Sequence, residues 1–167
     1  TEALGSLPGD LYSHGSATVS TIQQVAGAAG TALFITLMSR GTQSAIDDGV
    51  NLIVLSDRES DEKAAPIPSL LLTAAVHHHL VRKGLRTSVG LVVESGEPRE
   101  IHHFCCLAGF GAEAINPYLA FETLLQMKDE FPPDLTDDEI IYRYIKAIDK
   151  GLLKVMSKMG ISTYQSY

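Results

Sequence analysis

Short apolar runs that stop at polar clusters recur along the second half of the chain. The runs cover residues 51–55, 91–93 and 112–115, and each is followed by polar side chains. Two longer stretches, 69–83 and 98–108, lie between the runs and begin at or just after a proline, as helices often do. The pattern predicts an alternating strand-helix-strand-helix-strand order, which is typical of the α/β fold class.

Crossovers of this length join parallel strands, because antiparallel neighbours need only a short turn. We therefore expect repeated β-α units with a mainly parallel sheet, in a partial-barrel-like arrangement. The first run, residues 51–55, is followed at once by Ser56, and its continuous branched apolar side chains predict a strand buried on both faces. Ligands of parallel sheets bind just outside the carboxyl ends of the strands. Any chemistry is therefore expected in the polar clusters that follow the strands.

A helix is expected at residues 118–128, and two prolines break it within 131–134. Thr136 and Glu139 have the spacing of a capping box, which predicts that a long last helix starts at Thr136 and ends at Gly160. The expected inward stripe of this helix consists of Ile141, Tyr144, Ile145, Ile148, Leu152, Val155 and Met159.

Lysines recur every four residues on the last helix and should form a ridge on one side of it. A solvated stripe is the default interpretation, because cations are favoured near a helix C-terminus. The last lysine is also placed to meet an anion at the following segment, residues 161–167, which has strand propensity. The ridge consists of Lys146, Lys150, Lys154 and Lys158.

The amino-terminal part gives a weaker signal. Residues 1–26 are rich in Gly, Ser and Thr and are predicted to be a linker or lead-in, and residues 28–48 fit a helical stripe. At 167 residues the chain has room for one core, and its formal net charge of -7 without a dense basic block argues against a nucleic-acid surface. No apolar run reaches the roughly 18 residues that span a bilayer.

The two cysteines, Cys105 and Cys106, are neighbours on a predicted helix, where a bridge between them would be strained. This favours a reducing compartment and two small apolar side chains, with redox or metal roles as alternatives. The runs His77–His79 and His102–His103 suggest a metal, but only residues three or four apart face one another on a helix. We expect no metal site, although one shared between the two histidine runs stays open.

Polar side chains gather where the strands are expected to end. One interpretation makes them acid, base or substrate anchors. The commoner interpretation makes them helix caps and loop salt bridges that hold this rim in shape. The sequence contains no nucleophile-base spacing and no Gly-rich phosphate fingerprint that would favour a catalytic role. The candidate rim residues are Asp57, Arg58, Glu94, Ser95, Glu97 and Asn116.

Longer strings resemble a known family. From residue 51 to residue 167 they follow, in order and without identifiable gaps, the large subunit of glutamate synthase. The strings are LSDR (55–58), APIPSLL (65–71), AVHHHLVRKGLRT (75–87), VVESGEPREIHHF (92–104), AINPYLAFETL (114–124) and YIKAIDKGLLKVMSKMGIST (144–163).

The resemblance implies a position inside a larger enzyme. In that family an amidotransferase domain releases ammonia from L-glutamine, a central α/β domain follows, and an FMN-binding (β/α)8 barrel makes L-glutamate from 2-oxoglutarate. Residues 1–26 would be a lead-in, 27–149 the central domain, and 150–167 the truncated start of the barrel. The residues implied to approach FMN or 2-oxoglutarate are Lys158, Met159, Gly160, Ser162 and Thr163.

The implied role is to join the two active sites and to wall the ammonia channel, so the fragment alone should be inactive and carry no cofactor. FMN and an iron-sulfur cluster would belong to the parent, an NADPH- or ferredoxin-dependent oxidoreductase. Implied partners are the amidotransferase and FMN domains and either a small NADPH-oxidising subunit or ferredoxin, with no nucleic acid or membrane.

The implied location is the cytoplasm, or the plastid of a photosynthetic eukaryote. The isolated piece should self-associate through exposed apolar surface. The alternatives are a stand-alone α/β scaffold or interaction module without catalysis, and a small independent enzyme that uses Asp57, Glu94 and Glu97.

Overall fold

The computed structural model describes residues 41, 44, 49, 51–60 and 65–167. The chain divides into two compact units, Thr1–Gly41 and Thr42–Tyr167, and the described residues after Gly41 all belong to the second. The predicted lead-in at 1–26 lies outside the described residues. So does the predicted helix at 28–48, apart from Gly41 and Ser44, which are helical.

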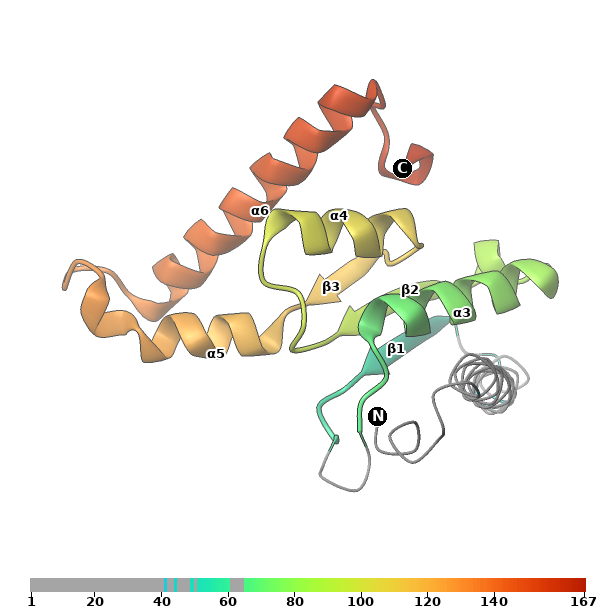
Figure 1. The fold of residues 1–167 in the computed structure, drawn as a ribbon, viewed down its shortest axis with the longest axis horizontal. Coiled ribbons are helices and arrows are strands. Elements are labelled where there is room, and N and C mark those ends of the chain that lie inside the picture. The colour runs from blue at the N-terminus through green and yellow to red at the C-terminus, as the bar shows by residue number, and fades with distance from the viewer. Residues whose placement is uncertain (1–40, 42–43, 45–48, 50, 61–64) are drawn as a thin grey trace, which may run out of the picture. The chain divides into compact units, whose positions relative to one another are not determined.

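Three parallel strands form the sheet, in the order β1-β2-β3 (Figure 1). They are β1 (Leu52–Ser56), β2 (Gly90–Glu94) and β3 (Ala114–Asn116). Val54 of β1 lies opposite Val92 of β2, which lies opposite Ala114 of β3. The predicted α/β class and the parallel sheet are confirmed.

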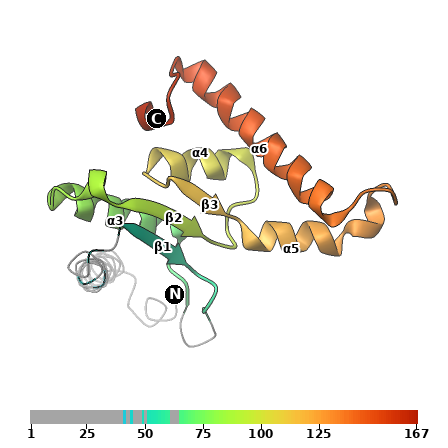
Figure 2. The same cartoon turned by 180° about the vertical axis from the view of Figure 1, so that it is seen from behind.

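Two helices make the crossovers, and two more follow the sheet. Helix α3 (Ser69–Arg82) and the 3-10 turn η2 (Arg86–Ser88) link β1 to β2, and α4 (Ile101–Gly109) links β2 to β3. Figure 1, and Figure 2 from behind, show α6 running back from the end of α5 past α4. The remaining elements are α5 (Tyr118–Gln126), η3 (Lys128–Glu130), α6 (Asp137–Met159) and η4 (Tyr164–Ser166).

The core lies between the sheet and its crossover helices. Val76 and Leu80 of α3 pack with Leu91 of β2, and Leu107 of α4 packs with Val93 of β2. Leu91 and Val93 point to the same face of β2, so α3 and α4 cover one face of the sheet. The strands follow one another in chain order and their helices lie on one side. Successive units of a β/α barrel have this arrangement, which the partial-barrel prediction implied.

The prediction that the first strand is buried on both faces is wrong. Leu52 and Val54 are 55% and 53% exposed, while Ile53 and Leu55 pack against the core. The reason is that both crossover helices lie on the same side, so alternate residues of β1 face away from them. The sheet thus keeps an apolar outer face with Leu52 and Val54 on it.

Helix α6 is capped at both ends as predicted. The Thr136 hydroxyl accepts a hydrogen bond from the Glu139 N–H at 3.2 Å, and Gly160 ends the helix with a φ of 71°. The inward face follows the predicted stripe in part, because Ile141, Tyr144, Ile148, Leu152 and Val155 are partly buried. Ile140 and Met156 are buried, whereas the predicted Ile145 and Met159 are 43% and 52% exposed.

Within the stripe, the ring of Tyr144 fits between Phe104 of α4 and Phe121 of α5, with centroids 6.5 and 5.9 Å away. All four ridge lysines, Lys146, Lys150, Lys154 and Lys158, are exposed, as the solvated interpretation predicted. Helix α6 also runs without a break through residues 149 and 150, where a domain boundary was predicted.

The tail does not form the strand that its propensity suggests. Residues 164–166 make the 3-10 turn η4, and the Tyr164 hydroxyl donates to the carbonyl of Ala112. The Tyr167 ring lies against Gly109. Burial raises the pKa of Tyr164 to about 12, so its hydroxyl stays a donor. In the part of the chain that the structure describes, no helix combines the length and the apolar character needed to cross a membrane.

Candidate functional site

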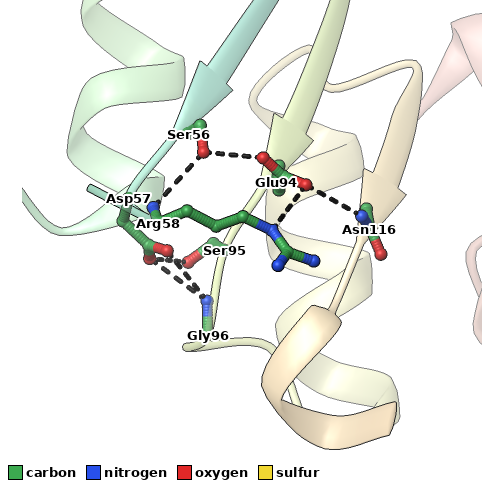
Figure 3. A network of polar contacts seen from close by, with 7 residues as sticks. All are labelled: Ser56, Asp57, Arg58, Glu94, Ser95, Gly96 and Asn116. Carbon is green, nitrogen blue, oxygen red and sulfur yellow. Dashed lines mark hydrogen bonds and ion pairs between the residues drawn. The ribbon is translucent and has the colours of Figure 1, made fainter. Parts of the chain in front are cut away.

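All six predicted rim residues lie together at the carboxyl ends of the three strands, and Figure 3 draws all of them except Glu97. Asp57 and Arg58 follow β1, and Glu94 ends β2. Ser95 and Glu97 follow β2, and Asn116 ends β3. Backbone hydrogen bonds continue the ladder into the rim, from the Asp57 N–H to the Glu94 carbonyl at 3.2 Å and from the Ser95 N–H to the Asn116 carbonyl at 3.1 Å.

Glu94 is the centre of the rim. Its Oε2 accepts from the Ser56 hydroxyl at 2.7 Å, and its Oε1 accepts from Arg58 Nε at 2.8 Å and from Asn116 Nδ2 at 3.1 Å. The Ser56 hydrogen bond is the largest cause that holds the pKa of Glu94 below its ordinary value. Burial opposes it, and the hydrogen bond and charge of Arg58 and the hydrogen bond of Asn116 add to the lowering. Glu94 is therefore a carboxylate at neutral pH that ties the three strand ends together.

Asp57 makes a second bridge between the loops after β1 and β2. Its Oδ2 accepts from the Ser95 hydroxyl at 2.6 Å and from the Gly96 N–H at 3.1 Å. Ser95 is 1% exposed, and its hydroxyl also accepts from the Glu97 N–H at 3.1 Å. The hydrogen bond to Asp57 raises the pKa of Tyr118, with burial as the next cause. The loop after β2 is thereby fixed in one conformation.

Glu97 caps a helix that is distant in sequence. Helix α3 has no side-chain cap of its own at Pro68. The Glu97 carboxylate instead accepts from the Ser69 N–H at 2.7 Å and from the Ser69 hydroxyl at 2.5 Å, at the positive end of that helix. The Thr73 hydroxyl then donates to the Ser69 carbonyl at 2.7 Å. Glu97 thus joins the rim to the start of α3.

Arg58 is held from two sides. Its Nε donates to Glu94, and its guanidinium carbon lies 4.3 Å from the centre of the Tyr118 ring, a cation-π contact. Its side chain is 46% exposed, so the charge remains well solvated. The guanidinium thereby links the rim to the first residue of α5.

Sequence reasoning missed Ser56, Ser69 and Tyr118 as members of this network. Ser56 could have been found, because it stands directly before Asp57 at the end of an apolar run. No sequence signal pairs Ser69 with Glu97, which lies 28 residues away, or Tyr118 with Arg58. These contacts depend on how the helices pack on the sheet.

The network favours a structural role over acid-base chemistry. Each of Asp57, Glu94 and Glu97 accepts hydrogen bonds from other parts of the chain, and Glu94 is held ionised. An ionised carboxylate surrounded by donors is a poor proton donor and a weak base. What the geometry provides is a rigid edge formed by the ends of three strands.

A second polar cluster lies at the opposite, amino-terminal edge of the sheet, around Arg86. Its guanidinium donates to the carbonyls of Val89 and Gly111, each at 2.8 Å, and to Glu113 Oε1 at 2.8 Å. Arg86 Nε donates to Nδ1 of His77 at 3.0 Å. Burial, followed by the charge of Arg86, lowers the pKa of His77, which therefore serves as a neutral acceptor for Arg86.

The remaining histidines are scattered. His79 is buried in α3, and burial lowers its pKa. His102 lies 3.6 Å from the sulfur of Cys106, and His103 accepts from the Arg99 N–H at 3.1 Å. Within the described ranges, no three His, Cys, Asp or Glu side chains are placed to hold a metal ion. Cys105, which is buried, and Cys106 are both free thiols.

The five residues implied to approach FMN are not brought to the rim. Lys158, Met159, Ser162 and Thr163 are exposed, and Gly160 is the cap of α6. The chain that follows them is anchored at Ala112, two residues before β3 begins. These residues therefore lie towards the other end of the strands from the rim.

Comparisons with known proteins agree on one family. A family model of the glutamate synthase central domain matches residues 7–167. The large chain of the NADPH glutamate synthase of Bacillus subtilis (strain 168) is 55% identical over 125 residues, which cover 75% of this chain and 8% of that protein. The NADH glutamate synthase of Schizosaccharomyces pombe is 46% identical over 143 residues, which cover 84% of this chain and 7% of that protein.

The ferredoxin-dependent glutamate synthase of Pyropia yezoensis is 43% identical over 143 residues, covering 78% of this chain and 9% of that protein. The chain thus spans between 7% and 9% of the length of these three relatives. The match over nearly the whole chain confirms the resemblance found in the sequence, and the chain belongs to the glutamate synthase central-domain family.

Proposed function

We propose that this chain is part of the large subunit of a glutamate synthase, the flavoenzyme that makes L-glutamate from L-glutamine and 2-oxoglutarate. The family match and the 55% identity to the Bacillus subtilis large chain carry the proposal. The chain would lie between the amidotransferase domain and the FMN domain of the same polypeptide. Residues 27–149 would form the central domain, with 1–26 as lead-in and 150–167 as the start of the FMN domain.

The role that we propose for the rim is to wall the passage along which ammonia travels. Such a wall must keep its shape and must not react with the ammonia. The closed network around Glu94 and Asp57 has both properties, because its carboxylates are already paired with donors from the chain. Asn116 and Ser95 extend the same edge over β3 and the loop after β2.

FMN and the iron-sulfur cluster belong, in this proposal, to other parts of the parent enzyme. The residues implied to approach FMN, Lys158, Met159, Gly160, Ser162 and Thr163, are all exposed, so they would be accessible to a neighbouring domain that carries the cofactor. Lys158 is the only cation among them. We therefore assign no cofactor contact to the folded chain on its own.

The electron donor is the least specified partner. The relatives named above are NADPH, NADH and ferredoxin enzymes, so the matched segment is common to all three. Either a small NADPH-oxidising subunit or ferredoxin would serve. The proposed location is the cytoplasm, or the plastid in a photosynthetic eukaryote, where relatives such as the chloroplastic enzyme of Arabidopsis thaliana, 40% identical, occur.

The wall role is tested in the parent large subunit by Asn116→Ala. Removing this amide opens one side of the Glu94 network, so ammonia should leak. The ratio of glutamine hydrolysed to glutamate formed should rise above the wild-type ratio, whereas Lys146→Ala on the exposed side of α6 should leave it unchanged. An unchanged ratio in a folded Asn116→Ala enzyme would contradict the wall role.

Membership of the larger enzyme is tested separately. The purified 167-residue chain should neither hydrolyse glutamine nor convert 2-oxoglutarate, and it should show no flavin absorbance. Turnover of either substrate by this chain alone would overturn the proposed division of labour, whatever the ammonia balance of the parent.

A further inference from the structure

Helix α4 carries a histidine and a cysteine on one face. The helix geometry that keeps His102 and His103 apart brings His102 and Cys106 together, because residues three or four positions apart face one another on a helix. His102 is exposed and Cys106 is partly buried, whereas the neighbouring Cys105 is only 1% exposed. The imidazole and one of the two thiols are therefore accessible together from solvent.

The two side chains stand at the separation of two ligands of one metal ion. Nε2 of His102 lies 3.6 Å from Sγ of Cys106. Zinc binds cysteine sulfur at about 2.3 Å and histidine nitrogen at about 2.0–2.1 Å, usually in a tetrahedral arrangement. These bond lengths and the tetrahedral angle place the sulfur and the nitrogen about 3.5–3.6 Å apart. The pair matches this separation without any rearrangement of α4.

The helix that holds the pair is fixed in place, and the pair itself is not engaged elsewhere. Phe104, Cys105, Leu107 and Ala108 anchor α4 in the core. Among the described residues, neither His102 nor Cys106 has a side-chain hydrogen bond other than their mutual contact. By contrast, His77 and His103 each use a ring nitrogen to accept a hydrogen bond, from Arg86 and from the Arg99 N–H. The ligand pair is thus both preorganised and available.

We propose that His102 and Cys106 form a binding site for a divalent metal ion of the zinc class. A sulfur and an imidazole nitrogen favour zinc over magnesium and calcium, which prefer oxygen ligands. Binding deprotonates the Cys106 thiol, and the proton passes to solvent.

The two ligands leave part of the coordination sphere open. The described chain adds no third His, Cys, Asp or Glu ligand. Two of the four tetrahedral positions therefore remain for water or for a group of a neighbouring domain. The site lies on α4 and not on the rim, so it stands apart from the proposed function.

Cadmium, a softer analogue of zinc, is the probe, because a cadmium-thiolate bond gives an ultraviolet charge-transfer band. The reduced 167-residue chain should develop this band with one equivalent of cadmium. Excess zinc should remove the band, and excess magnesium should not. Cys106→Ser should abolish the band although the buried Cys105 remains.

His102→Gln tests the second ligand. It should weaken cadmium binding at least ~10-fold, a factor equivalent to about 1.4 kcal/mol. His78→Gln is the matched control, because His78 is also an exposed helical histidine within a histidine run but has Arg82 four positions later. This control should bind cadmium as tightly as the wild type.

A full band in Cys106→Ser, or equal affinities of His102→Gln and His78→Gln, would overturn the proposal. NMR of the nitrogen-labelled wild type gives a readout that does not depend on the folding of any variant. The Nε2 resonance of His102 should shift when one equivalent of zinc is added, and that of His78 should not. An unshifted His102 resonance would reject the site.

Discussion

Three segments of the chain meet at the carboxylate of Glu94, which accepts from Ser56, Arg58 and Asn116. Ser56 and Arg58 stand at and just after the end of β1, Asn116 ends β3, and Glu94 itself ends β2. Because a carboxylate accepts stronger hydrogen bonds than an amide, the negative charge of Glu94 decides how firmly the three ends are held. This residue is therefore the most informative single position in the rim.

Glu94→Gln should lower the melting temperature, and the loss should depend on pH. The folded-state pKa of Glu94 lies below its ordinary value of 4.5, so its contribution is complete above that pH and disappears as the pH falls through the lower folded value. The wild type should therefore melt well above the variant at neutral pH, and the two should converge in acid. Melting curves over a pH series check this, and a difference independent of pH would be inconsistent with a charge effect.

Arg86 plays the corresponding part at the other end of the strands. Its side chain is 18% exposed and donates to two carbonyls, a carboxylate and an imidazole. A lysine keeps the charge but cannot supply donors in several fixed directions. The arrangement also requires Gly111, because a Cβ there would lie 2.3 Å from Nδ1 of His77 and the glycine has a φ of 107°.

Arg86→Lys should destabilise the fold by about 2 kcal/mol, the typical effect of losing hydrogen bonds from a charged donor to buried groups. Arg82→Lys, on the exposed end of α3, is the matched control and should have almost no effect. Urea unfolding of both variants measures the difference. Similar midpoints for the two proteins would show that the Arg86 contacts are dispensable.

The ends of helix α6 were predicted correctly from the sequence, and its buried face only in part. Thr136 and Gly160 mark its ends through local chemistry, which is visible in the sequence. Its buried face was predicted only in part: Tyr144 packs inward against its two aromatic neighbours, but the apolar band also contains Ile145, which is exposed, and Ile140, which is buried. The width of this band leaves its edges undecided in the sequence.

Thr136→Ala should weaken this helix by about 1 kcal/mol, because the Glu139 N–H loses its acceptor. Thr136→Ser keeps a hydroxyl at the same place and should retain most of the stability. Thermal unfolding of the three proteins checks the order. Equal losses for alanine and serine would mean that the methyl group, and not the hydrogen bond, matters at this position.

The sheet was predicted more fully than its surroundings. Polar residues directly after apolar runs located Asp57, Glu94 and Asn116 on one rim, because parallel strands bring their carboxyl ends together. The sequence could not show that both crossover helices lie on one side. That fact leaves Leu52 and Val54 exposed, and it depends on the handedness and order of the strands rather than on their composition.

At the scale of the whole molecule, this outer face of the sheet exposes apolar side chains in the part of the chain that the structure describes. Leu52 and Val54 project from β1, and Val92 lies beside Val54 on the neighbouring strand. Apolar groups gathered on an open sheet face favour association. The proposed place between two larger domains gives such a face a natural cover.

The isolated chain should therefore self-associate in a concentration-dependent manner, and Val54→Lys should reduce this. Val81→Lys is the matched control, because Val81 on α3 is 51% exposed and Val54 is 53% exposed. Sedimentation velocity over a range of concentrations distinguishes them. If both lysine variants behave alike, association does not depend on the sheet face.

The order of the strands has a consequence for synthesis. Strand β2 pairs with the strand made before it, and β3 pairs with β2, so each new unit finds its partner already present. As the polypeptide leaves the ribosome it can grow from one end, without waiting for a distant segment to close the sheet. In the proposed large subunit, this segment could thus assemble vectorially before later portions of the polypeptide have been translated.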